Sequence, residues 1–391
     1  MGKLKCFEIV FTENKTVYHP GERVHGQCIV DIKGEMRMRA LRIFMRGVAK
    51  VHWTESRSTG TRLGSYTEHY KAEVEYFFKR LVLFDGDRGT LNEGRHEFDF
   101  SFEVPLDRTI STSFEGKHGS IRYWLKAEMD KPWALNHKTK RAFTVISPID
   151  INRSEFQIPV ENSAEKRLCC WLCTSGPVSI TARTDRRGYC PGESIAIWAH
   201  FENHTSRTVI PYATLHQTQT FYATGKSRVR ATKFTVLTGL PVAAGSRATW
   251  DAQLLKIPAV SPSIVNCCLI KVEYYVKVAV HIPGAYNLAL NLPITIGTVP
   301  HRSGRLPLAL PVPPPYREIA TPPPPIDDPP PTYVESLGGA VSIRDEDDDE
   351  QNTIGELLFT PMYTYVVDYR FRPPPAYSEQ DPHPLPAANR V

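Results

Sequence analysis

The C-terminal quarter of this 391-residue chain contains three copies of the tetrapeptide Pro-Pro-x-Tyr. Proline holds φ near the polyproline II value, so such a segment is already extended and loses little conformational entropy on binding. WW domains bind this shape in grooves lined with aromatic side chains, and the tyrosine offers a large side chain with a polar tip. Three copies therefore predict a tail that WW domains bind. The predicted contact residues are Pro313, Pro314, Tyr316, Pro330, Pro331, Tyr333, Pro374, Pro375 and Tyr377. Phosphorylation of the three tyrosines is the alternative use, but the two prolines before each favour WW docking.

No catalytic motif is recognisable in the chain. His96-Glu97 lacks the second histidine of a zinc-protease helix and stands in an alternating strand pattern. Neither a glycine-rich phosphate loop nor a nucleophile elbow is present. We therefore predict a protein that is not an enzyme and has no cofactor.

A cysteine cluster, formed by Cys169, Cys170 and Cys173, contains a C-x-x-C pair, a spacing used in redox and zinc sites. A structural zinc ion takes four ligands, and no second C-x-x-C or H-x-x-x-H follows. We therefore predict no metal ion and interpret these residues as free thiols that pack in the core or at a hinge. A redox role is the alternative.

The formal net charge is +5, and the basic residues are scattered along the chain. This distribution argues against nucleic acid as a partner. A patch for acidic lipid or a phosphorylated partner is the alternative to an ordinary solvated surface. An acidic run at 345–350 is interpreted as a solvated segment, or alternatively as one that folds back and covers a basic face.

Nothing at the N-terminus resembles a signal sequence, since the apolar stretch that such a sequence requires is missing. No run approaches the ~18 consecutive apolar residues that span a bilayer. The chain has only eight cysteines for its length. These features predict a soluble protein of the reducing cytoplasm.

The elements that carry these motifs are predicted to be strands almost throughout. Alternation places Phe98, Phe100, Phe102 and Val104 on one face of a strand. Turn signals such as Pro-Gly separate further short strands, and sustained helical periodicity is absent. Short strands at regular spacing predict an all-β fold built from immunoglobulin-like sandwiches.

Two sequence patterns recur in the same order along the chain. The turn at 18–24 (YHPGERV) recurs at 189–195 (YCPGESI), and the strand pattern at 121–126 (IRYWLK) is echoed at 272–277 (VEYYVK). Two related β-sandwiches in tandem would show both recurrences, so we predict a duplication.

The chain changes character near residue 300. Proline runs and the acidic run leave few aliphatic residues to bury, so the tail is predicted to be disordered. The aromatic stretch at 357–371 is the exception, and it could add a strand or dock on the folded part. The predicted organisation is a sandwich at 1–150, a connector at 151–176, a second sandwich at 177–299 and the tail at 300–391.

Several further segments match a known family. They are 53–57 (WTESR), 112–120 (TSFEGKHGS), 188–193 (GYCPGE), 256–258 (KIP) and 373–379 (PPPAYSE). Together with the repeat they resemble the α-arrestin family, in particular its subgroup of arrestin domain-containing proteins 2 and 3. The resemblance implies two arrestin-like β-sandwiches joined by a short hinge. It also implies an adaptor that brings Nedd4-class HECT ubiquitin ligases to membrane receptors and transporters, with recruitment from the cytoplasm to the plasma membrane and endosomes through its partners.

Two departures from the family pattern bear on function. Members of this subgroup usually carry two PPxY motifs behind a serine-rich linker, whereas this chain has three behind a short one. A thioredoxin-binding relative has a cysteine just before a tryptophan, but Thr249 precedes Trp250 here, so no mixed disulfide with thioredoxin is expected. The alternatives are a cytosolic redox or metabolic regulator that uses the cysteine cluster, and a retromer-like trafficking scaffold.

Overall fold

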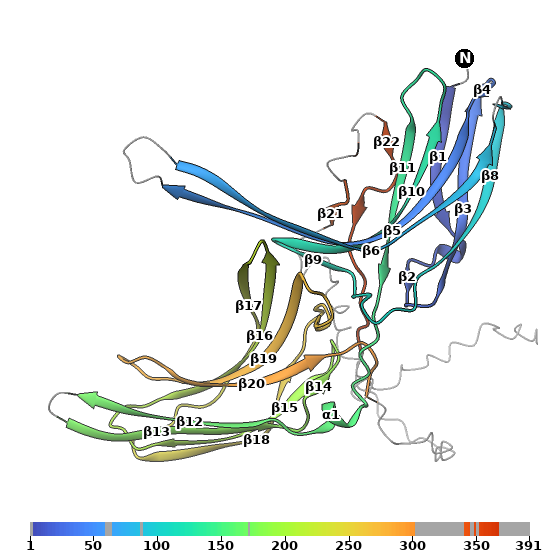
Figure 1. Ribbon diagram of the computed structural model, residues 1–391. Coiled ribbons are helices and arrows are strands. Elements are labelled where there is room, and N and C mark those ends of the chain that lie inside the picture. Colours follow the sequence, from blue (N-terminus) through green and yellow to red (C-terminus); the bar gives the residue numbers. More distant parts are fainter. Residues whose placement is uncertain are drawn as a thin grey trace, which may run out of the picture.

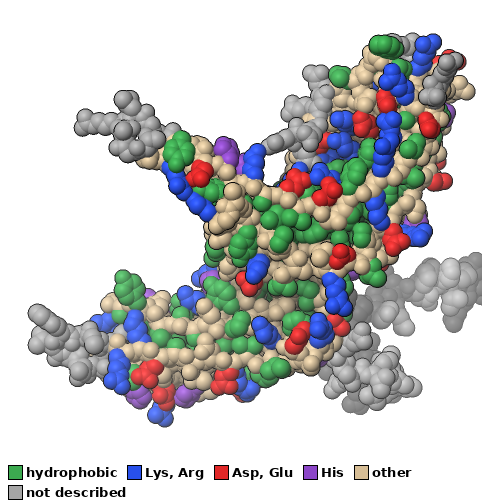
Figure 2. Space-filling view, viewed as in Figure 1, with side chains coloured by type: hydrophobic (Ala, Val, Ile, Leu, Met, Phe, Trp, Pro, Cys, Tyr) green, Lys and Arg blue, Asp and Glu red, His purple; other side chains and the backbone are tan. Residues whose placement is uncertain are grey.

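Two β-sandwiches follow one another along the chain, and a long hairpin of β5 (Ala40–Ser58) and β6 (Ser65–Asp85) projects from the first of them (Figure 1). Helix in the described part of the chain is limited to η1 (Thr12–Asn14) and α1 (Ser154–Gln157). The all-β prediction is confirmed. Figure 2 shows an open hollow between the projecting hairpin and the C-terminal sandwich. The computed structural model describes residues 3–58, 65–86, 89–170, 173–301, 340–344, 348 and 352–366.

The N-terminal sandwich has one sheet of three strands and a larger facing sheet. Along the strand predicted from alternation, Phe100, Phe102 and Val104 are buried and Phe98 is partly buried, so the shared face is confirmed. The first sheet has the order β1 (Lys3–Phe11), β3 (Arg23–Lys33), β8 (Gly94–Glu103). The facing sheet has the order β2 (Val17–Tyr18), β11 (His137–Val145), β10 (Gly119–Asp130), β5, β6, with β9 (Phe114–Gly116) beside β10. The short strands β4 (Met36–Arg37) and β7 (Thr90–Leu91) pair separately.

The C-terminal sandwich repeats this plan with two sheets. One has the order β12 (Glu161–Cys170), β13 (Cys173–Thr184), β15 (Ser194–Asn203), β18 (Ser246–Lys256). The other has the order β14 (Gly188–Tyr189), β20 (Leu288–Ile296), β19 (Ile270–His281), β16 (Ile210–Ala223), β17 (Lys226–Thr238). Alternate side chains of β19, such as Val272, Tyr274 and Val276, are buried between the two sheets.

Equivalent hydrogen bonds in the two sandwiches confirm the duplication. The Tyr123 hydroxyl donates to the Ser111 carbonyl at 2.6 Å, and the Tyr274 hydroxyl donates to the Ser261 carbonyl at the same distance. All four residues are buried. Each tyrosine thus ties its strand to the loop before it in the same way, which sequence coincidence does not explain.

The repeated Pro-Gly turns also have the same geometry. Gly21 has φ +87° and its amide donates to the Val104 carbonyl at 2.9 Å, while Gly192 has φ +90° and its amide donates to the Ile257 carbonyl at 3.0 Å. A left-handed φ favours glycine because other residues carry a Cβ that collides with the backbone. The glycine of the repeated pattern is therefore required by the turn.

The connector between the sandwiches is shorter than the predicted 151–176. Residues 161–170 form β12, which pairs with β13, so they belong to the second sandwich. The sequence of β12, ENSAEKRLCC, is largely polar and exposed, because this strand lies at the edge of its sheet and offers no apolar alternation to recognise. The cysteine cluster therefore lies at the β12–β13 hairpin and not at a hinge.

Part of the tail predicted to be disordered is ordered strand. The described tail residues form β21 (Val341–Ser342), β22 (Thr353–Ile354) and β23 (Leu358–Phe359). β22 pairs in parallel with β11 of the N-terminal sandwich, and β21 pairs with β23 (Figure 1). The expectation that the aromatic stretch adds a strand is confirmed for Leu358–Phe359.

Candidate functional site

All nine residues of the predicted WW-binding motifs lie outside the described residues. The structure instead places the chain on either side of them. The first two motifs lie between His301 and the docked tail, and the third follows Val366. The His301 ring nitrogen Nε2 lies 3.1 Å from Gln157 Oε1 in the connector. The tail is thus attached at its start and again near its middle.

We call the described tail residues 340–344, 348 and 352–366 the docking segment. Apolar contact contributes to its attachment, since Ile343 and Phe359 are buried. Its backbone extends the larger N-terminal sheet: the Lys138 amide donates to the Asn352 carbonyl at 2.8 Å. Burial and sheet pairing together hold it against β11.

One carboxylate of the acidic run is buried against two lysines. Asp348 Oδ2 accepts from Lys140 Nζ at 3.0 Å, and its other oxygen accepts from Lys126 Nζ. The side chains of Lys140 and Asp348 are fully buried, and Lys140 also donates to the Ile343 carbonyl and lies 4.5 Å above the Trp124 ring. For Asp348 the alternative interpretation, in which the acidic run folds back on a basic face, is confirmed and the solvated one is wrong.

The end of the docking segment bridges the two sandwiches. Tyr363 donates its hydroxyl proton to the Ser113 carbonyl of the N-terminal sandwich at 2.7 Å. Three residues later the Val366 amide donates to the Pro191 carbonyl in the repeated turn of the C-terminal sandwich at 2.8 Å. A Cβ on Gly192 would stand 2.1 Å from the Val366 carbonyl oxygen, so this turn fits the tail only because it carries glycine.

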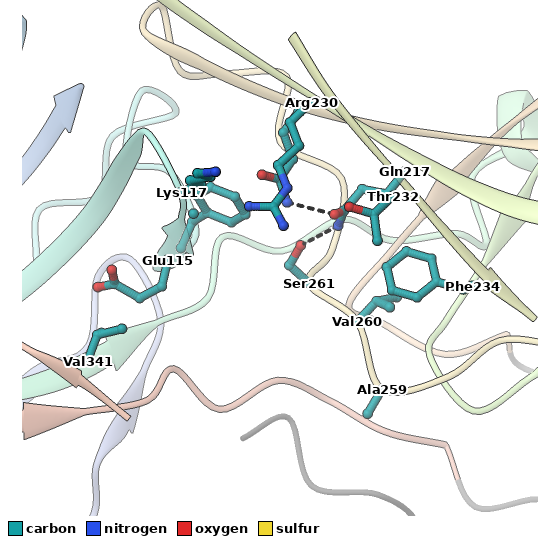
Figure 3. A pocket seen from close by; sticks show the side chains of 13 residues that line it. Glu115, Lys117, Gln217, Arg230, Thr232, Phe234, Ala259, Val260, Ser261 and Val341 are labelled. Carbon is teal, nitrogen blue, oxygen red and sulfur yellow. Dashed lines mark hydrogen bonds between the residues drawn. The ribbon is translucent and has the colours of Figure 1, made fainter. Parts of the chain in front are cut away.

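A pocket of about 360 Å³ opens between the sandwiches beside the docking segment (Figure 3). The exposed cations Lys117 and Arg230 come from opposite sandwiches, and Val341 of β21 contributes to the wall. The buried amide Gln219 donates to Gln217 Oε1 at 2.7 Å, and its own Oε1 has no partner among the described residues. The lining thus offers two cations, an acceptor without a partner among the described residues and the ring of Phe234.

The wall on the N-terminal side contains a buried ion pair. Glu115 accepts two hydrogen bonds from Arg122, at 2.6 and 3.0 Å. Burial raises the pKa of Glu115, and the guanidinium opposes that rise. The pair shapes this wall of the pocket, whose other charged lining residues are the cations Lys117 and Arg230. Within the described residues no group of three or more His, Cys, Asp or Glu side chains is arranged to hold a metal ion.

Two described cysteines are poor nucleophiles. Burial raises the pKa of the Cys28 thiol to about 12, and burial together with the charge of Glu193 raises that of Cys190 to about 12. Only the thiolate reacts, so neither thiol is suited to redox exchange near neutral pH. In the cysteine cluster the backbones of Cys170 and Cys173 pair across the hairpin, and their side chains lie outside the described residues. No described helix is long and apolar enough to cross a membrane.

Both halves of the chain match models of one family. Residues 7–152 match the arrestin (or S-antigen) N-terminal domain, and residues 174–301 match the arrestin C-terminal domain. The chain belongs to the α-arrestin family. Arrestin domain-containing protein 4 of Mus musculus is 36% identical over 408 residues, covering 98% of this chain and 94% of that protein. Thioredoxin-interacting protein of Sus scrofa is 32% identical over 406 residues, covering 97% of each.

The α-arrestin sequence did not reveal the residues that hold its tail. On β11, strand alternation places Lys140 on the outer face of the sheet, where a side chain is normally solvated. Its partner Asp348 lies 208 residues later in the chain. A lysine on the outer face of a strand is normally exposed. The signal that the sequence offered was the acidic run, for which folding back on a basic face was the alternative interpretation.

Proposed function

We propose that this α-arrestin is an adaptor whose three PPxY motifs bring Nedd4-class HECT ubiquitin ligases to membrane receptors or transporters, promoting their ubiquitination, endocytosis and endosomal sorting. The protein would act in the cytoplasm and reach the plasma membrane and endosomes through its partners. The observation that carries the proposal is the presence of three PPxY motifs in a tail attached to two arrestin sandwiches. No nucleic acid, metal ion or cofactor takes part.

The docking segment changes how the motifs are presented. Tyr316 and Tyr333 lie 17 residues apart, and Tyr377 follows Tyr333 by 44 residues. A free coil of 44 residues would span roughly 35–40 Å. Because this interval includes the docking segment, the body of the protein sets the distance between the second and third motifs. Two WW domains of one ligase can still engage together, which raises avidity by about 10²–10⁴ over one contact.

The lysine distribution supports transfer of ubiquitin away from the tail. Lys277 is the last lysine of the chain, so no lysine lies in the segment that carries the motifs. Lysine acceptors must then lie on the sandwiches or on another protein. The hypothesis is that the tail directs ubiquitin to cargo and to the arrestin body. Mapping modified lysines by mass spectrometry checks it, and a cargo that stays unmodified would count against it.

Titration of the full chain with a tandem WW fragment of a Nedd4-class ligase tests the proposal. The wild type should bind, each single Tyr→Ala change at Tyr316, Tyr333 or Tyr377 should weaken binding in part, and the triple change should abolish it. Complete loss from Tyr377→Ala alone would contradict simultaneous engagement. No binding by the wild type would reject the adaptor function.

A redox regulator is the second candidate, because relatives of this chain bear the name thioredoxin-interacting protein. Against it, Thr249 stands before Trp250 and the described thiols Cys28 and Cys190 are buried. Replacing Cys169, Cys170 and Cys173 by serine should disable a redox protein and leave an adaptor active. A retromer-like scaffold would instead keep its function in the triple Tyr→Ala variant.

A further inference from the structure

In the turn between β10 and β11, an aromatic residue has an unfavourable backbone conformation. Trp133 has φ +61° and its side chain is 98% exposed. Leu135, two residues later, is 69% exposed. A left-handed φ is rare for bulky residues, and a side chain that is almost fully exposed buries little apolar surface in the fold. The turn lies at the end of the N-terminal sandwich that is farthest from the C-terminal one (Figure 1).

The duplicated turn in the C-terminal sandwich shows what the conformation alone requires. There the equivalent of Trp133 is Gly284, with φ +69°. Both turns are closed by the same contact: Asn136 Oδ1 accepts from the Lys131 amide, and Asn287 Oδ1 accepts from the Ile282 amide, each at 3.3 Å. Glycine therefore suffices to build this turn, and Trp133 occupies the position at a cost to folding.

The turn segment itself is basic. The segment 131–138 (KPWALNHK) contains two lysines, one histidine and no acidic residue. The carboxylates just before it are engaged: Asp130 Oδ2 pairs with Arg42 at 3.1 Å, and Glu128 Oε1 accepts from Asn136 at 2.7 Å.

Further cations lie on the neighbouring strand connection. The Arg39 amide donates to the Asp130 carbonyl at 2.8 Å, and its side chain is exposed, as is that of Arg37. Among the described residues, exposed carboxylates at this end include Glu35, Asp85 and Glu93. Basic side chains stand close to apolar ones there in Figure 2.

We propose that segment 131–138 is a direct contact with the surface of an anionic bilayer. Trp133 and Leu135 enter the headgroup region, where tryptophan is favoured, while Lys131, Lys138 and Arg39 face lipid phosphates. Because segment 131–138 is small, its binding to the bilayer is weak and salt-sensitive, and it adds to recruitment through partners. The proposal does not rest on the WW-binding function.

Co-sedimentation of the full chain with vesicles tests this contact. The wild type should bind vesicles of phosphatidylcholine mixed with phosphatidylserine and not vesicles of phosphatidylcholine alone, and added salt should weaken the binding. Trp133→Gly should abolish most of it, and Lys131→Gln should weaken it by roughly fivefold. Leu240→Ser is the matched control, because Leu240 is 85% exposed on the C-terminal sandwich and lies in segment 239–246 (GLPVAAGS), which contains no charged residue. It should bind as the wild type does.

The glycine variant separates binding from folding. Gly284 already adopts this conformation, so Trp133→Gly should unfold at a temperature no lower than the wild type. Its affinity for the WW fragment should be unchanged. Vesicle binding by Trp133→Gly equal to that of the wild type would overturn the proposal. Absence of vesicle binding by the wild type would also overturn the proposal. A protein partner would then be the alternative that binds segment 131–138.

Discussion

At the scale of single residues, the buried pair of Lys140 and Asp348 is the most consequential feature of the molecule. Opposite charges are removed from water here, and Asp348 is the carboxylate partner of both the buried Lys140 and Lys126. Loss of one partner of such a pair typically costs about 3–5 kcal/mol, because it leaves a buried charge without compensation. Loss of this one carboxylate is therefore expected to weaken the attachment of the docking segment at β11.

We predict that Asp348→Asn releases the docking segment from β11. The loss should appear as faster hydrogen exchange of the Lys138 amide, which donates to the Asn352 carbonyl in the wild type. Glu356→Gln is the matched control. Glu356 also pairs with a cation of β11, Arg141 at 3.2 Å, but its side chain is 65% exposed, so its removal should change little. Unchanged protection of Lys138 in Asp348→Asn would show that apolar contacts hold the segment unaided.

Thiol reactivity provides a second prediction for single residues. In the native protein at pH 8, iodoacetamide should modify the exposed Cys268 and leave Cys28 and Cys190 intact. Burial both blocks access and raises the pKa of the latter two to about 12, so their thiolate fraction is negligible. Unfolding in denaturant should make the modification rates of the three cysteines equal. Site-resolved mass spectrometry gives the rates, and native labelling of Cys28 at the rate of Cys268 would contradict the buried position.

At the scale of elements, the same substitution can be made in each of the two repeated turns and its effects compared. Alanine at Gly21 or Gly192 imposes the same left-handed strain, of about 1–2 kcal/mol. The surroundings differ: the Cβ at 21 would meet the flexible Leu106 Cδ1 at 3.3 Å, whereas the Cβ at 192 would meet the Val366 carbonyl oxygen. We predict that Gly192→Ala displaces the end of the docking segment and that Gly21→Ala does not.

Limited proteolysis near Tyr363 and Tyr365 measures this difference. Cleavage there should accelerate in Gly192→Ala and not in Gly21→Ala, and Gly192→Ala should lose at least as much thermal stability as Gly21→Ala. Equal cleavage in the two variants would mean that the Val366 contact with Pro191 does not hold the tail.

The strands also show which parts of the fold could be predicted from the sequence. Alternation and the repeated Pro-Gly turns gave the strands of both sandwiches, because those signals follow from local burial and local φ. β12 escaped recognition because an edge strand without apolar alternation resembles a polar connector. The position of Lys140 was not predictable, because the segment that covers it pairs across some 200 residues and depends on tertiary contact.

At the scale of the whole molecule, the two sandwiches meet through apolar contacts, such as the ring of Phe221 against that of His118, and through polar ones. Asn266 is the most connected of them: its amide nitrogen donates to the carbonyls of Arg108 and Ile110, each at 3.0 Å, and its oxygen accepts from the Ser111 hydroxyl at 3.0 Å. The connector adds the Ile149 amide, which donates to Thr298 Oγ1 at 2.8 Å. Loss of a residue that makes several such contacts is expected to permit motion of one sandwich relative to the other.

We predict that Asn266→Ala loosens the two sandwiches without unfolding either one. Three hydrogen bonds at about 1 kcal/mol each are lost, and the Ser111 hydroxyl must find another partner. Calorimetry should resolve two transitions where the wild type shows one, and small-angle scattering should report a larger radius of gyration. Asn287→Ala is the control, since Asn287 hydrogen-bonds within the C-terminal sandwich. If Asn266→Ala keeps one transition and the scattering of the wild type, the docking segment, which touches both Ser113 and Pro191, is the element that fixes their orientation.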